Sequence, residues 1–125
     1  MKVLTTCIAA LTLSAGGVSA QAWIHDRLAG AEVVYETGND APAPTQSWDS
    51  EGGTVYDSGQ PLLGQHTGFW EVRHGQYCSY FGPVDHRDRD WTCWNVEFPT
   101  EDTVVFSAPP GPWIGPREVT GRFVR

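Results

Sequence analysis

Residues 68–81 read GFWEVRHGQYCSYF, and this stretch decides the fold. Two short runs rich in aromatic residues, 68–73 and 76–81, flank the dipeptide His74-Gly75. A two-residue connection that ends in glycine, placed between two such runs, is typical of a β-hairpin. The stretch therefore predicts two adjacent antiparallel strands joined by a tight turn.

Further short runs of strand-forming residues lie on both sides of this hairpin. They cover residues 31–36, 46–49, 54–57, 91–98, 103–106 and 119–124, and a second hairpin turn is expected at residues 51–53. The best helical candidate, residues 22–28, has one or two turns. Seven or eight short strands without crossover helices predict an all-β fold, either a small antiparallel barrel or a half-barrel.

Two of the six tryptophans are expected in the core of this fold. Trp70 lies just before the tight turn, and Trp94 follows a cysteine. A small barrel fills its interior with large aromatic side chains, which favours burial of both rings. Trp113 differs because it follows the proline-rich residues 109–112. Its ring either covers one end of the barrel or, if it is exposed on this stiff loop, binds a partner or a sugar.

The first 20 residues have the pattern of a secretory signal peptide. Met1-Lys2 gives a basic start, residues 3–18 are mainly apolar, and small residues precede a cleavage site after Ala20. Three threonines, one serine and two glycines among residues 3–18 make this segment too polar for a permanent membrane span. We therefore expect a single β-domain, residues 21–125, in the periplasm or outside the cell and without a membrane anchor.

Two cysteines remain after such processing, Cys78 and Cys93. An even number of cysteines in an exported chain predicts disulfide bonds, and two cysteines allow only one pairing. The bridge closes a loop with 14 intervening residues, for which chain entropy predicts a stabilisation of about 3 kcal/mol. A redox role is disfavoured because the close C-x-x-C spacing is absent.

The charge of the processed chain limits its partners. Seven arginines and no lysine stand against 15 carboxylates, which gives a net charge of −8. Such a domain repels phosphate groups, so nucleic acid and anionic membranes are poor partners. A basic protein would suit the charge, and so would simple solubility.

Ionisable residues concentrate in residues 82–90. Their signs alternate, and the spacing lacks the glycine and the terminal glutamate of a calcium loop, so we expect a solvated loop and no metal site. The four histidines are scattered, no G-x-S-x-G motif occurs, and both remaining cysteines are used in the bridge. No catalytic residue and no cofactor site is therefore assigned.

The segments Gly68–Trp70, Gly75–Cys78 and Cys93–Val96 resemble the core of small exported bacterial domains of unknown function. That core reads G-x-W, a short turn, Y/F-C, a polar loop and C-x-x-V. The resemblance implies a small antiparallel barrel with a cross-strand disulfide, and it implies no activity. More distantly, the chain is similar to the periplasmic barrel-type inhibitors of metalloproteases and of lysozyme.

These features favour a non-catalytic binding or inhibitor-like module of the cell envelope. The expected partner is an envelope or extracellular protein, bound through exposed loop residues. The candidate contact residues are Trp113, Asp85, Arg87, Asp88, Arg89 and Asp90. A structural or stress-related envelope protein without a specific ligand is the second hypothesis, and an enzyme is the third.

The signal peptide is tested by the mass of the secreted protein. We expect the mature chain to begin at Gln21, because the small residues before that position suit signal peptidase. Intact-mass measurement on periplasmic or secreted material checks the cleavage site. A mass that still includes Cys7 contradicts the prediction.

Overall fold

The computed structural model describes residues 16–88, 90–110 and 117–124, with the backbone alone for residues 16–20. One helix and eight strands follow along the chain, with a short 3-10 helix, η1 (Val84–His86), between the fifth and sixth strands. Their bounds are α2 (Gly16–Leu28), β1 (Glu32–Tyr35), β2 (Thr45–Trp48), β3 (Gly53–Asp57), β4 (Gln65–Arg73), β5 (Gln76–Tyr80), β6 (Thr92–Thr100), β7 (Thr103–Ala108) and β8 (Arg117–Phe123).

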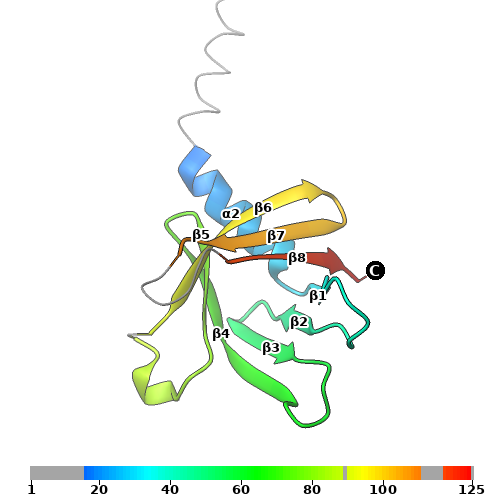
Figure 1. Ribbon diagram of the computed structural model, residues 1–125. Coiled ribbons are helices and arrows are strands. Elements are labelled where there is room, and N and C mark those ends of the chain that lie inside the picture. Colours follow the sequence, from blue (N-terminus) through cyan, green and yellow to red (C-terminus); the bar gives the residue numbers. More distant parts are fainter. Residues whose placement is uncertain (1–15, 89, 111–116, 125) are drawn as a thin grey trace, which may run out of the picture.

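The eight strands form a closed antiparallel barrel in which neighbours in sequence are neighbours in space (Figure 1). The barrel closes where β1 pairs with β8, with Val33 opposite Phe123 and Tyr35 opposite Gly121. Closure satisfies the backbone hydrogen bonds that would otherwise line two open sheet edges. The all-β prediction is confirmed, and of its two alternatives the structure has the barrel.

The predicted hairpin is the pair β4–β5. Arg73 pairs with Gln76 across the turn, and both turn residues have positive φ, 52° at His74 and 76° at Gly75. Positive φ at both central positions defines the type I′ turn, whose twist matches that of the two strands. Local chemistry at two residues therefore sets the register of the central hairpin.

The helix is longer than the sequence predicts. Residues 22–28 were expected to form one or two turns, whereas α2 extends over 13 residues and crosses Ala20. Of its described side chains, Ile24 and Leu28, one turn apart, are buried in the core. Two anchors on one face are too few to predict a helix from periodicity, because a stable amphipathic helix usually shows a wider apolar stripe.

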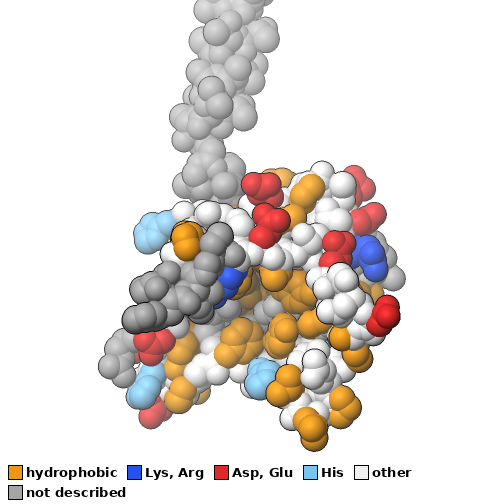
Figure 2. Space-filling model, in the orientation of Figure 1, with side chains coloured by type: hydrophobic (Ala, Val, Ile, Leu, Met, Phe, Trp, Pro, Cys, Tyr) orange, Lys and Arg blue, Asp and Glu red, His pale blue; other side chains and the backbone are white. Residues whose placement is uncertain are grey.

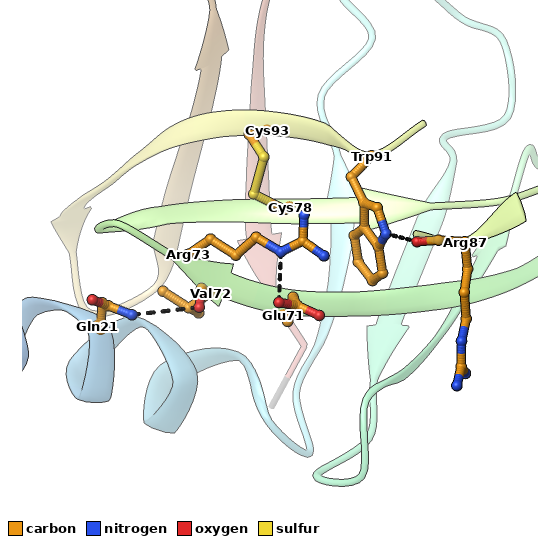
Figure 3. A network of polar contacts seen from close by, with 8 residues as sticks. All are labelled: Gln21, Glu71, Val72, Arg73, Cys78, Arg87, Trp91 and Cys93. Carbon is orange, nitrogen blue, oxygen red and sulfur yellow. Dashed lines mark hydrogen bonds and ion pairs between the residues drawn. A yellow bond between two sulfur atoms is a disulfide. The ribbon is translucent and has the colours of Figure 1, made fainter. Parts of the chain in front are cut away.

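The disulfide is formed as predicted. Cys78 on β5 lies directly opposite Cys93 on β6, and Figure 3 shows the bond joining the two strands. Cys78 is fully buried. The bridge therefore links strands that already pair through backbone hydrogen bonds.

Aromatic side chains and α2 fill the core. The buried core residues are Ile24, Leu28, Val33, Trp48, Trp70, Tyr77, Val104 and Phe106. Trp70 is 3% exposed, as predicted. The prediction for Trp94 needs a correction, because this ring packs against the core and yet is only partly buried. It lines a cavity, as described below.

The cross-strand disulfide makes a measurable contribution to stability. Reduction, or the double substitution Cys78→Ala and Cys93→Ala, is expected to lower the free energy of unfolding by about 2–5 kcal/mol, because the unfolded chain regains loop entropy. Denaturant unfolding with and without reductant measures the effect. The double variant is the control, since reductant cannot act on it. An oxidised protein whose stability is unchanged by reductant would contradict the prediction.

Candidate functional site

Helix α2 closes one end of the barrel. Its side chains contact three strands. His25 stacks on Trp70 of β4, with the ring centroids 5.1 Å apart. The Arg27 guanidinium lies 4.4 Å from the Phe98 ring of β6 and 5.3 Å from the Phe123 ring of β8. The Arg27 Nη2 also donates to the Glu101 carbonyl in the β6–β7 turn at 3.1 Å. This end of the barrel is therefore filled.

The opposite end of the barrel is open and contains a cavity of about 540 Å³. Figure 2 shows the hollowed face, with hydrophobic side chains gathered in and around the hollow. The wall comes from all eight strands and the adjoining loops: Tyr35, Glu36, Thr37, Pro44, Gln46, Tyr56, His66, Tyr77, Ser79, Phe81, Trp94, Phe106 and Val119. A concave, mainly aromatic wall with a few polar groups is typical of a site for a small molecule.

A hydrogen-bonded network centred on Gln46 lies in this wall. The Tyr35 hydroxyl donates to Gln46 Oε1 at 2.6 Å, and Gln46 Nε2 donates to Thr54 Oγ1 at 2.9 Å and to the Tyr77 hydroxyl at 3.2 Å. The Tyr77 hydroxyl also accepts from Trp48 Nε1 at 2.9 Å. The network thus pairs polar atoms that burial would otherwise leave unsatisfied, and it links β1, β2, β3 and β5.

The two network tyrosines remain neutral. Burial raises the pKa of Tyr35, and the nearby Tyr77 and Tyr56 phenols raise it further. Burial also raises the pKa of Tyr77, against the opposing effect of the hydrogen bonds that it receives. Both phenols therefore act as O–H groups at physiological pH and not as nucleophiles or bases.

Phe81 forms one side of the open end, and Gly68 makes room for it. A Cβ atom at position 68 would lie 2.7 Å from Cδ1 of the Phe81 ring, closer than real contacts allow. Phe81 remains 42% exposed. The ring therefore borders the entrance of the cavity, held against a glycine that the G-x-W motif supplies.

Arg117 is not a lining residue of the cavity, but it contacts one, since its guanidinium lies 4.8 Å from the Trp94 ring centroid. It begins β8, where alternation along the strand places it on the same face as Val119, which lines the cavity, and Gly121, which is buried. Ala108 of β7 pairs with Arg117. Only this small side chain therefore lies between Arg117 on β8 and Trp94 on β6. The Arg117 Nε is buried and has no hydrogen-bond partner among the described residues.

A second, more polar hollow of about 420 Å³ lies on the outside of the barrel. The Arg73 guanidinium lies 4.4 Å from the Trp91 ring and binds Glu71 at 2.6 Å. The Arg87 guanidinium lies 5.2 Å from Phe69. Trp91 Nε1 donates to the Arg87 carbonyl, a contact that Figure 3 shows beside the disulfide. The loop after β5 is thereby held against the outer face.

Four of the six residues predicted to bind a partner are described, and all four are exposed in this loop: Asp85, Arg87, Asp88 and Asp90. None of them lines the large cavity, although Arg87 and Asp88 line the outer hollow. Trp113 and Arg89 lie outside the described residues. The four described residues of the predicted surface and the cavity are thus in different places on the molecule.

Sequence reasoning missed the cavity. Its wall joins residues from position 35 to position 119, and no local motif marks a set that only barrel closure brings together. One signal was present: Tyr35, Tyr56 and Tyr77 each lie within an expected strand, and strands of a small barrel place alternate residues inside.

No group of three or more histidine, cysteine, aspartate or glutamate side chains in the described part of the chain could hold a metal ion. Among the described helices, none is long and apolar enough to cross a membrane.

The buried tyrosines make stability depend on pH in the alkaline range. In the unfolded chain a phenol ionises with a pKa of about 10, whereas the folded barrel raises the pKa of Tyr35 and of Tyr77. The folded state therefore keeps protons that the unfolded chain loses, so their contribution is complete below about pH 10 and declines above it. Unfolding curves at increasing pH measure the decline, and Tyr35→Phe should reduce it. A free energy of unfolding that is constant through this range would contradict the prediction.

Comparisons of this chain with protein-family models, with curated proteins and with solved structures find no match.

Proposed function

We propose that the protein is an exported, non-catalytic binding protein that holds a small, largely apolar molecule in the open end of its barrel. The observation that carries the proposal is the cavity of about 540 Å³ with its aromatic wall. Sites for small organic ligands usually measure about 300–1,000 Å³ and combine apolar walls with a few fixed polar groups. An eight-stranded barrel can hold one such ligand in its mouth.

The polar groups of the wall support binding and not catalysis. Gln46, Tyr35 and Tyr77 are engaged with one another, and the phenols have pKa values raised by burial. A neutral, internally paired network orients rings and supplies hydrogen bonds, while a general base needs a pKa near the working pH. Export is part of the proposal because of the signal-peptide pattern in residues 1–20.

A protein partner is a second candidate, and the outer hollow favours it. Phe69 and Trp91 lie there beside Arg73, Arg87 and Asp88, and aromatic and arginine side chains are enriched at protein interfaces. This surface includes part of the loop that the sequence analysis assigned to an envelope partner. The cavity remains the first candidate because it is larger and mainly apolar.

Binding in the cavity is tested with N-phenyl-1-naphthylamine, a neutral aromatic probe whose fluorescence rises in apolar sites. We expect saturable binding, and we expect Val119→Trp to weaken it about tenfold or more, the equivalent of about 1.4 kcal/mol. Val119 lines the cavity and is 38% exposed, so a larger ring there occupies the site without entering the core.

The matched control is Val84→Trp, which adds the same ring at an exposed position outside the cavity. Circular dichroism and the melting temperature confirm that both variants fold. Absence of saturable binding to the unmodified protein, or equal affinity of the Val119→Trp variant, would contradict the proposal.

A further inference from the structure

We propose that the molecule held in the cavity is an organic anion, with its apolar body inside the barrel and its acid group on the Arg117 guanidinium. This inference rests on the proposed function and specifies the chemical class of the ligand. Its basis is the placement of Arg117 against the cavity wall and the lack of a counter-ion for it among the described residues.

Arg117 lies next to the cavity wall. It is two residues from Val119 on β8, so the two side chains lie on the same face of the strand, and Val119 lines the cavity. Its guanidinium lies against Trp94, another residue of the wall, at 4.8 Å from the ring centroid. Stacking on the indole holds the guanidinium plane and leaves its N–H edges for acceptors. The charge is therefore held at the border of an apolar hollow.

One hydrogen-bond donor of Arg117 lacks an acceptor among the described residues. The Arg117 Nε is buried, and no hydrogen bond to it is made within residues 16–88, 90–110 and 117–124. Buried polar atoms are normally paired, so an unpaired guanidinium donor in contact with Trp94 of the wall favours a bound acceptor on this side chain. A carboxylate or sulfonate suits this donor, because a guanidinium binds such groups through two parallel hydrogen bonds.

No carboxylate among the described residues forms an ion pair with Arg117. Among the described residues the ion pairs are Arg73–Glu71 and His25–Asp26, neither of which includes Arg117. Glu118 follows Arg117 on the opposite, exposed face of β8.

Besides the phenols, the ionisable residues that line the cavity are Glu36 and His66. Glu36 directly follows β1, and its backbone N–H donates to the carbonyl of Thr120 on β8 at 2.9 Å, three residues along β8 from Arg117. An acid group is therefore repelled from the Glu36 side and attracted to the side formed by Arg117 and Trp94. The attraction is local, since the processed chain as a whole carries a charge of −8.

Two fluorescent probes that differ by one acid group test this inference. They are N-phenyl-1-naphthylamine and 1-anilinonaphthalene-8-sulfonate, which share the same aromatic body. In the unmodified protein we expect the sulfonate to bind more tightly. Arg117→Met keeps an apolar side chain against Trp94 but loses the charge-assisted hydrogen bonds. We therefore expect the dissociation constant of the neutral probe divided by that of the sulfonate to fall by about tenfold or more.

Two further variants test whether the preference for the sulfonate probe depends on the guanidinium of Arg117. Arg117→Lys should retain part of the preference, because an ammonium group keeps the charge without the planar fork. Arg122→Met is the matched control: it removes the same charge from the same strand at an exposed position, and it should leave the ratio unchanged. Neutral-probe binding by Arg117→Met also reports that the variant is folded.

The outcomes separate this inference from the proposed function. If both probes bind and Arg117→Met leaves their ratio unchanged, the anion is not held by Arg117 and the inference is wrong, while the cavity site stands. A ratio that falls equally in Arg122→Met overturns it as well, since the effect then follows net charge. If neither probe binds the unmodified protein, the proposed function itself fails.

Discussion

The packing of α2 into one end of the barrel is the contact on which the rest of the structure depends. A closed barrel of eight strands encloses a space that side chains must fill. Leu28 and Ile24 fill it at one end, supported by the stack of His25 on Trp70. Because a helix occupies that end, the aromatic side chains of the strands need to cover only the middle, and the other end stays hollow. The asymmetry of the molecule follows from this one contact.

The network around Gln46 solves a problem that an aromatic interior creates. Trp48, Tyr35 and Tyr77 supply large apolar surfaces, but each carries a polar hydrogen that is costly to bury without a partner. Gln46 Oε1 accepts from the Tyr35 hydroxyl, and the Tyr77 hydroxyl accepts from Trp48 Nε1 and from Gln46 Nε2. The same contacts fix how far each ring can turn. The hydrogen bonds therefore make the cavity wall rigid, although its aromatic residues would otherwise pack with less defined orientations.

Sequence and structure agree where the determining interactions are local. The type I′ turn at His74-Gly75 needs only two residues with positive φ, and the disulfide needs only that Cys78 and Cys93 face each other. The partial burial of Trp94 could not be predicted, because the inner face of β6 is defined only once β1 and β8 pair. Arg117 was missed for the same reason, since Trp94 meets it only across β7.

The difference between the closed and the open end also affects how quickly a bound molecule could leave the cavity. A molecule bound in the cavity, as proposed, would leave past Phe81 and Val119, which are both partly exposed, and the packing of α2 need not loosen for this to happen. Residence time is then governed by side-chain motions of nanoseconds to microseconds at the entrance together with the contacts broken on leaving. Global unfolding, which is far slower in most small domains, does not limit it. The barrel can therefore be very stable and still release its contents quickly.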